Sequence, residues 1–380
     1  MRILHIIPSL NIGGAERLVI DICQVLGKMD HTVKLVVLHK EGGHKLPQNP
    51  TFSIEYLNED FVLRFLRHSK KYPQKLHRVL KCFNPDIIHS HLQEAEFVSR
   101  LAALSKDHKV AWFSHCHDSM SRIRPPSGWA PWSKSWYVAW YEHRVLSRLY
   151  KKNQPQHFLA ISESEKKYFE ESKGLDGKIS LLRNAIDVEK FIRPAKRLSK
   201  DPLRLINVGS FQAKKNQAYL LLVLKHLKAN PKVQAHLTCL GDGDLKVPFL
   251  NRSKELGVAP WVTATGNVSN VAQYLWKGEV YVHSAKYEPF GLVLVEAMAA
   301  GLPVIALDAG GNRDIVEDGV NGYLLPKDTN PKVFAEKIMA VWQDKELLAS
   351  LQKGAIRTAA KYDIGPYCQK LAKLYEAALL

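Results

Sequence analysis

The sequence is poor in cysteine and has no long uncharged apolar run. Its five cysteines are scattered over 380 residues, and no two of them form a Cys-x-x-Cys pair. An odd number of dispersed thiols is typical of a protein from a reducing compartment and not of a disulfide scaffold. The longest apolar stretch, from Leu292 to Leu307, is interrupted by Glu296, Gly301 and Pro303. It therefore falls short of the roughly 20 uncharged residues of a membrane span.

The first residues also lack the pattern of an export signal. Only a few apolar residues precede Pro8, which is too few for the apolar core of a signal peptide. We therefore expect a cytoplasmic protein that associates at most peripherally with the inner face of a membrane.

Acidic residues are scarce relative to basic ones. The chain has 54 Lys and Arg against 37 Asp and Glu, a net charge of +17. Residues 1–200 contribute 33 − 20 = +13 and residues 201–380 contribute 21 − 17 = +4. Two stretches concentrate the excess. Residues 61–83 hold seven cations and no acid, and residues 119–152 hold seven cations, one acid and four tryptophans (Trp129, Trp132, Trp136, Trp140).

Tryptophans interleaved with cations suit the headgroup region of an anionic membrane. These stretches therefore predict a basic, aromatic surface that brings the protein to a lipid-linked substrate. A solvated basic face with the tryptophans in the core is the alternative. Nucleic acid is not an expected partner, because the charge excess comes with no recognisable binding motif.

Short apolar runs alternate with helical stretches along the chain, which predicts doubly wound parallel α/β sheets. A chain of 380 residues fits two such domains of about 180 residues each. The two halves open alike, each with a strand followed by glycine. The predicted strands are residues 3–7, 33–38, 85–91, 110–114 and 158–161 in the first half, and 204–208, 236–240, 262–266, 280–284 and 304–307 in the second.

Residues 287–307 carry the most informative pattern. Glu288 precedes a Pro-Phe-Gly that opens an apolar helix containing Glu296. A helix N-terminus presents unpaired N–H groups that favour a bound phosphate, and carboxylates beside it can accept sugar hydroxyls. The apolar neighbours of Glu296 predict a buried helix, in which an unpartnered carboxylate is costly. The pattern indicates a nucleotide-sugar site, and a simple helix cap with a solvated Glu296 is the alternative.

The glycine pair Gly13 and Gly14 joins the first strand to a helical pattern. Such a turn lets a ligand approach backbone amides closely. It lacks the third glycine of the dinucleotide fingerprint, which argues against a dehydrogenase.

The stretch around Glu288 is similar to the signature of the GT4-type retaining glycosyltransferases of the GT-B fold. It has a Glu, seven residues, Glu-Ala-Met-Ala, Gly-Leu-Pro-Val and a Gly-Gly turn at Gly310. The resemblance implies two Rossmann-like, doubly wound parallel-sheet domains that face each other across a cleft. Residues 1–190 would form the acceptor side and residues 191–361 the donor side. A last helix, residues 362–380, would cross back to the first domain.

The resemblance also implies roles for the acids and glycines. Glu296 would hold the ribose hydroxyls and Glu288 would contact the sugar ring. Gly13 and Gly14 would face the donor across the cleft, and the turn at Gly310 would lead into a second helix with phosphate-facing amides. Further backbone amides would face the phosphate and the sugar (Phe290, Gly291, Leu292).

A lysine is expected to take the place of a metal ion. Lys215 would stabilise the leaving diphosphate, an electrostatic task that often dominates such catalysis. Ser210 stands where the family usually has an Arg, so another cation, Lys214 or Arg183, would have to compensate. Gly241 belongs to a glycine loop that resembles the one near the nucleobase.

Histidines end the fourth predicted strand. In the resembled family a His-Asp pair at this place points into the cleft near the transferred sugar, and His117-Asp118 matches it, with His115 as the second choice. His91 would line the same crevice. The spacing of His115, Cys116 and His117 fits no zinc pattern.

No metal site is predicted elsewhere. Asp242 and Asp244 mimic the Asp-x-Asp of metal-dependent glycosyltransferases, but their glycines suit a tight strand-to-helix loop, and two carboxylates alone hold a divalent ion weakly.

The resemblance thus implies a metal-independent hexosyltransferase without a cofactor. It would move a sugar, with retention, from a nucleotide diphosphate sugar, expected to be UDP-linked, to a glycan or lipid-linked acceptor in bacterial-type polysaccharide or glycolipid assembly. The alternatives are a GT-B-like nucleotide-sugar epimerase or phosphorylase, or a non-enzymatic basic binding protein.

Overall fold

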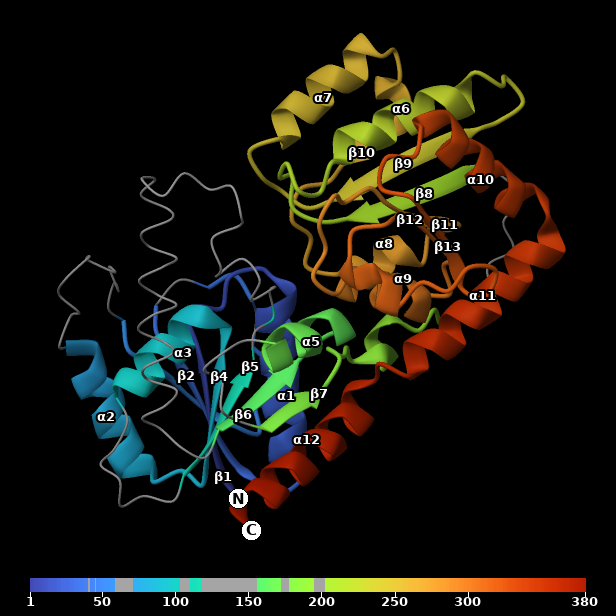
Figure 1. The fold of residues 1–380 in the computed structure, drawn as a ribbon. Helices are drawn as coiled ribbons and strands as arrows, with labels where there is room; N and C mark the ends of the chain where they lie inside the picture. The colour runs from blue at the N-terminus through green and yellow to red at the C-terminus, as the bar shows by residue number, and fades with distance from the viewer. Residues whose placement is uncertain are drawn as a thin grey trace. The chain divides into compact units, whose positions relative to one another are not determined.

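The structure, a computed structural model, describes residues 1–39, 42–44, 46–58, 71–102, 110–115, 117, 156–171, 178–194 and 202–380. The chain divides into two compact units (Figure 1). Unit 1 comprises Met1–Ala185 and Ile364–Leu380, and unit 2 comprises Ile186–Asp363. The sequence placed these changes of domain at 190/191 and 361/362. Cys116, Asp118, the four tryptophans and residues 61–70 of the first basic stretch lie outside the described residues.

Unit 1 is built on a sheet of seven parallel strands in the order β3-β2-β1-β4-β5-β6-β7. The described helices of this unit include the last helix of the chain. The strands are β1 (Arg2–Ile7), β2 (Thr32–Val37), β3 (Ser53–Tyr56), β4 (Ile87–His91), β5 (Ala111–His115), β6 (Gln156–Ala160) and β7 (Lys178–Leu181), and the helices are α1 (Gly14–Lys28), α2 (Lys71–Phe83), α3 (Leu92–Leu101), α5 (Glu163–Glu171) and α12 (Ile364–Leu379).

Strand alternation divides the core of unit 1 between the two faces of the sheet. Ile3 and Ile7 pack with α1 and α12 on one face, whereas Leu4 and Ile6 pack with α2 and α3 on the other. Side chains at odd positions of β1, β4 and β5 therefore point toward α1 and α12. Tyr375 of α12 is buried there, whereas Leu379 at the end of this helix is 42% exposed.

Unit 2 is built on a sheet of six parallel strands in the order β10-β9-β8-β11-β12-β13. Its strands are β8 (Leu203–Val208), β9 (Ala235–Leu240), β10 (Val262–Ala264), β11 (Val280–His283), β12 (Val304–Leu307) and β13 (Gly322–Leu325). Its helices are α6 (Gln217–Lys228), α7 (Lys246–Glu255), α8 (Val271–Leu275), α9 (Leu292–Ala299), α10 (Pro331–Gln343) and α11 (Lys345–Ala360).

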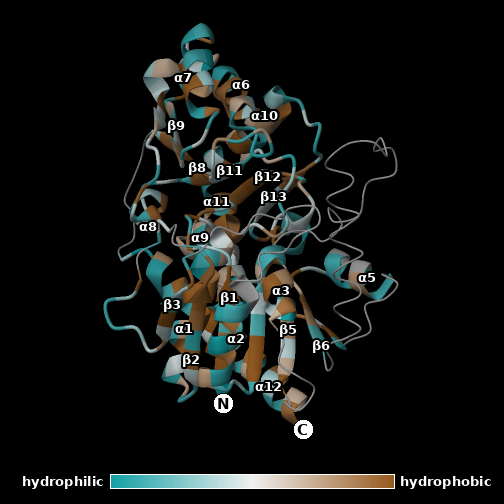
Figure 2. Cartoon of the chain, turned by 90° about the vertical axis from the view of Figure 1, so that its left-hand side faces the viewer, coloured by the Kyte–Doolittle hydropathy of each residue, from teal (hydrophilic) through white to brown (hydrophobic). Residues whose placement is uncertain are grey.

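The predicted strands are all present, and three further strands were missed. The missed strands, β3, β7 and β13, each lie at an edge of a sheet. Strands β3 and β7 are half exposed and carry no continuous apolar run. Central strands such as β12, which is entirely buried, carry one, and Figure 2 shows its hydrophobic colour.

Candidate active site

The predicted acid Glu288 lies at the carboxyl ends of two central strands of unit 2. It follows β11, and Lys215 lies in the loop between β8 and α6. The Lys215 ammonium is 2.5 Å from Glu288 Oε2, and Nε2 of His283, the last residue of β11, is 3.4 Å from the same oxygen. Glu288 is 8% exposed. The fold therefore assembles an acid, a lysine and a histidine where ligands bind to open parallel sheets.

The neighbours of Glu288 keep it ionised. Burial alone would raise the pKa of Glu288, but the His283 imidazole and the Lys215 ammonium outweigh burial and lower this pKa to about 2. Burial lowers the pKa of His283, although Glu288 acts in the opposite sense. At neutral pH Glu288 can therefore accept hydrogen bonds from hydroxyl groups, but it has no proton to donate.

Backbone contacts fix Lys215 beside β11. The Ser284 hydroxyl donates to the Lys215 carbonyl at 3.0 Å, and the Lys286 amide donates to the Lys214 carbonyl at 2.8 Å. Gln217 donates to the Gly209 and Ser210 carbonyls at the start of this loop. The Lys215 ammonium thus rests on a loop that is tied to the strand below Glu288.

The Gly-Gly turn holds the Glu288 loop in place. The Glu288 amide donates to the Ala309 carbonyl, and the Gly311 amide donates to the Glu288 carbonyl at 2.8 Å. A Cβ on Gly311 would lie 1.9 Å from the Pro289 carbonyl oxygen. The sequence expected a helix with phosphate-facing amides here. The element is a four-residue 3-10 helix, Gly311–Asp314, and its first amide, that of Gly311, is bonded to Glu288.

Helix α9 exposes part of the face that carries Glu296. Leu294, Val295 and Met298 are buried, whereas Glu296 is half buried. The expected fully buried helix is therefore only partly correct. Burial raises the pKa of Tyr281 on β11, and the charges of Glu288 and Glu296 raise it further. Both carboxylates therefore lie near the same strand.

The glycines around this site bring backbone segments close together. Gly291 has φ +103° at the start of α9, a conformation that glycine adopts without strain. A Cβ on Gly241 would lie 2.2 Å from the Gly209 carbonyl oxygen, so the loops after β8 and β9 touch beside half-buried Ser210. Phe290 is 2% exposed. The amide of half-buried Leu292 begins α9.

Asp242 of the Asp-x-Asp pattern has a lysine as its neighbour. Its carboxylate lies 3.3 Å from Lys246 Nζ, and both Asp242 and Asp244 are exposed. The Asp242 carboxylate therefore forms an ion pair with a lysine of the same protein.

The predicted site residues of the first half of the chain lie in unit 1. His117 is buried; its Nδ1 is 3.2 Å from Asn184 Oδ1 and its Nε2 is 3.0 Å from His91 Nδ1. Burial lowers the pKa of His117 to about 4, although Asn184 acts in the opposite sense. His115, the second choice, is also buried. Arg183 lies 3.5 Å from Glu163.

Gly13 and Gly14 begin α1 as predicted. Gly13 is the extended residue before the helix, and its amide nitrogen and carbonyl oxygen lie 3.1 and 2.9 Å from His44 Nε2.

The sequence interpretation missed His283, His5 and Asn184. His283 could have been found from its place near the end of the predicted strand 280–284, shortly before Glu288. Within the part of the chain that the structure describes, no helix is long and apolar enough to cross a membrane.

Comparisons with known proteins support the family resemblance that the sequence motifs predict. Residues 12–190 match the sequence family described as Glycosyltransferase Family 4, and residues 188–358 match Glycosyl transferases group 1. The chain is 25% identical over 370 residues, 94% of each chain, to N-acetylgalactosamine-N,N'-diacetylbacillosaminyl-diphospho-undecaprenol 4-alpha-N-acetylgalactosaminyltransferase of Campylobacter jejuni.

Solved structures extend the likeness to the fold. The chain resembles sucrose-phosphate synthase from Thermosynechococcus elongatus, with a TM-score of 0.81, 18% identity and coverage of 99% of this chain and 98% of that one. It also resembles Anabaena Alr3699/HepE in complex with UDP, with a TM-score of 0.77, 21% identity and coverage of 99% and 100%. The predicted GT-B fold with two parallel-sheet domains is confirmed. The chain therefore belongs to the GT4-type glycosyltransferases of the GT-B fold.

Proposed function

We propose that this glycosyltransferase moves a sugar from a UDP-sugar to a glycan or lipid-linked acceptor, with retention of the anomeric configuration. The observation that carries the proposal is the ionised Glu288 between Lys215 and His283 at the carboxyl ends of β8 and β11. An ionised, partly desolvated carboxylate accepts sugar hydroxyls, and the lysine beside it attracts a diphosphate.

The donor occupies unit 2 in this proposal. The Glu288 carboxylate accepts hydroxyls of the sugar ring, and the half-buried Glu296 accepts those of the ribose. The diphosphate lies against Lys215 and the first amides of α9, at Phe290, Gly291 and Leu292, with the base near Gly241. Lys214, which is half buried next to Lys215, supplies the second cation that Ser210 does not. No metal ion is required.

The transfer step forms one bond and breaks one. The acceptor oxygen bonds to the anomeric carbon while the bond from this carbon to the diphosphate oxygen breaks, and its electron pair remains on the leaving diphosphate. The acceptor attacks from the face that the diphosphate leaves, which accounts for retention. Its proton passes to a diphosphate oxygen on that face. Lys215 stabilises the added charge. Gly13, Gly14 and His117 of unit 1 keep the acceptor-side roles that the family resemblance implies.

Two relatives support the choice of donor and acceptor. The structurally similar Anabaena protein is in complex with UDP, and the name of the Campylobacter relative specifies a diphospho-undecaprenol substrate. The basic excess of residues 1–200 fits an acceptor that is embedded in an anionic membrane, so assembly of a polysaccharide or glycolipid at that surface is the corresponding role.

A nucleotide-sugar panel tests the proposal. UDP and one UDP-sugar are expected to raise the melting temperature, because a ligand that binds the folded state stabilises it by mass action. Turnover with an acceptor extract should release UDP and form a new glycosidic bond. Glu288→Gln should lower kcat/KM by about 10-fold or more, since a hydrogen bond to a charged group is worth about 1.5–3 kcal/mol. Glu255→Gln, an exposed change on α7, is the matched control.

Other products would contradict the transfer reaction. An epimerised donor or a free sugar phosphate would instead identify the epimerase or phosphorylase, and no response to any nucleotide would favour a basic binding protein.

A further inference from the structure

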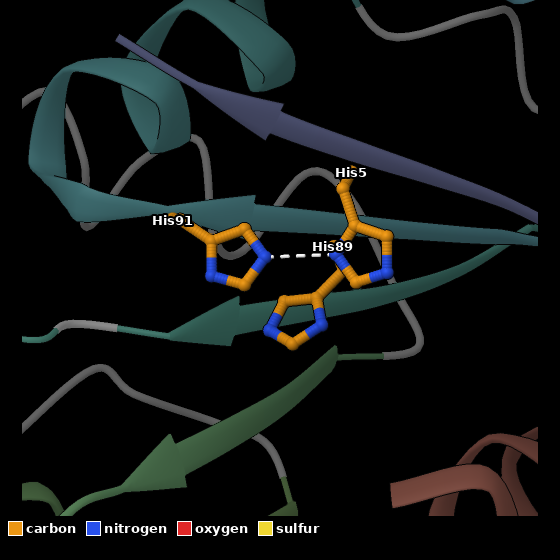
Figure 3. Close-up of side chains that lie close together, drawn as sticks. All are labelled: His5, His89 and His91. Carbon is orange, nitrogen blue, oxygen red and sulfur yellow. Dashed lines mark hydrogen bonds between the residues drawn. The ribbon is translucent and has the colours of Figure 1, made fainter. Parts of the chain in front are cut away.

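Five buried histidines lie on one face of the unit 1 sheet. Two pairs are direct register partners: His5 of β1 with His89 of β4, and His91 of β4 with His115 of β5. Odd positions of these strands face α1 and α12, so the alternation of the strands brings the imidazoles together. His117 follows β5 and completes the cluster. Figure 3 shows His5, His89 and His91 side by side.

Three of these rings form a chain through their edges. The distance from His5 Nδ1 to His91 Nε2 is 2.8 Å and the ring centroids are 5.1 Å apart. From His91 Nδ1 to His117 Nε2 the corresponding values are 3.0 and 5.3 Å. In each pair the centroid separation exceeds the nitrogen distance by about one ring diameter, and the ring planes differ by 20° and 10°. The nitrogens therefore face each other in nearly coplanar rings.

These gaps fit a shared proton and not a metal ion. Zinc lies about 2.0–2.1 Å from each imidazole nitrogen. Two nitrogens that face each other across 2.8 or 3.0 Å leave no room for an ion between them. The remaining rings, His89 and His115, pack face on against the chain, with centroids 4.1 Å from His91 and 4.0 Å from His117.

The end of the chain sets its direction. His117 Nδ1 lies 3.2 Å from the Asn184 side-chain oxygen. An amide oxygen can only accept, so this placement of the Asn184 amide assigns the proton of His117 to Nδ1. His117 Nε2 then accepts from His91 Nδ1, and His91 Nε2 accepts from His5 Nδ1. The chain ends at His5 Nε2, a buried atom with no hydrogen-bond partner among the described residues. This direction leaves an unused acceptor there, which proteins tolerate better than a buried, unpaired N–H.

Burial agrees with neutral rings throughout. It lowers the pKa of His5 to about 3 and that of His117 to about 4, and it also lowers the pKa of His91. At neutral pH each ring therefore has one N–H and one lone pair, as a directional chain requires.

We propose that Asn184, His91 and His5 are positioning residues that lock His117 in one orientation and in its Nδ1–H tautomer. The inference deepens the proposed transfer reaction and rests on it. Both ring nitrogens of His117 are engaged, so this residue offers the sugar a fixed surface and not a basic nitrogen. The acceptor proton then has to leave with the diphosphate.

Two-bond nitrogen–proton NMR correlation of the full chain, labelled with 15N-histidine, tests the tautomers without turnover. At pH 7, His5, His91 and His117 are expected to be neutral and protonated on Nδ1. Asn184→Ala should remove the tautomer preference of His117 and lower kcat about 10-fold, with the donor KM unchanged. Asn184→Asp keeps a hydrogen-bond acceptor at this position and should restore the His117 tautomer preference and kcat. His157→Gln changes a histidine of β6 that is not part of the histidine chain, and it should alter neither the His117 tautomer nor kcat.

Protonation of the three rings on Nε2 would overturn the proposal, and so would an Asn184→Ala variant that retains the wild-type tautomers. Stoichiometric zinc in the purified protein would also overturn it, because an ion and a shared proton exclude each other here. If Asn184→Ala does not fold, the wild-type tautomers alone decide. If the tautomers are as expected but the protein releases no UDP, the transfer reaction is refuted and the proposed histidine chain still holds.

Discussion

Acid should destabilise unit 1 because its buried histidines resist protonation. In the unfolded chain each histidine titrates with a pKa near its ordinary value of 6.5, whereas burial lowers the pKa of His5 to about 3 and that of His117 to about 4. Below pH 6.5 the unfolded state therefore binds protons that the folded state does not. The stability is fully present above pH 6.5 and falls as the pH drops toward 4.

The size of the loss follows from these shifts. Between pH 7.5 and 5.5, each histidine that stays neutral in the folded state costs about 1.4 kcal/mol. His5 and His117 together should therefore remove about 3 kcal/mol from the free energy of unfolding of unit 1. His89, His91 and His115, whose pKa values burial also lowers, add to this loss. Glu288 of unit 2 does not contribute, because its pKa is about 2 and its stabilisation is lost only below pH 4.5.

Hydrogen exchange read by mass spectrometry can follow the two units in one sample. The opening free energy of peptides from β1 and β4 should fall between pH 7.5 and 5.5 by more than that of peptides from β12, after correction for intrinsic exchange. His5→Gln should reduce the slope below pH 6 by about 1.4 kcal/mol per pH unit. A unit 1 stability that is flat or rises on acidification would refute the argument.

The remaining predictions concern the donor site, the backbone, metal and the membrane. Glu296→Ala should weaken UDP-sugar binding by at least about 10-fold, the value of one charged hydrogen bond, and unchanged binding in calorimetry would remove this assignment. Gly311→Ala should cost about 2 kcal/mol or more in urea unfolding because of overpacking, whereas Gly319→Ala, with open space at φ +73°, should cost about 1 kcal/mol; equal losses would contradict the close contact with Pro289. EDTA should leave turnover unchanged, and inactivation that manganese reverses would contradict a metal-independent mechanism. The protein should sediment with anionic liposomes at low salt, and a protein that stays in the supernatant would contradict the membrane hypothesis.

The sequence was most informative where burial and pattern coincide. Strand β12 was predicted with the correct bounds because all four residues are apolar and buried, and Glu288 was found from its motif. Strand β7 was missed because polar and apolar residues are mixed in its short, half-exposed segment. The expected burial of Glu296 was too complete, because its apolar neighbours in sequence occupy other faces of α9.

The histidine chain could not have been predicted from the sequence. The alternate histidines His89 and His91 of β4 are visible in the sequence, but their partners depend on β1 and β4 being neighbours in the sheet. That order, and the exact register of His5 against His89, come from tertiary packing. The sequence expectation of no metal considered His115, Cys116 and His117 alone, without the two strands that complete the cluster.

The return of α12 to unit 1 has a consequence for the nascent chain. Residues 186–363 are contiguous, so the core of unit 2 can close as soon as they leave the ribosome. Unit 1 lacks Tyr367, Leu371 and Tyr375, which belong to its core, until these residues have also been synthesised. Most of unit 1 is therefore made before unit 2 but can be completed only after it, and its open core depends on residues 364–380.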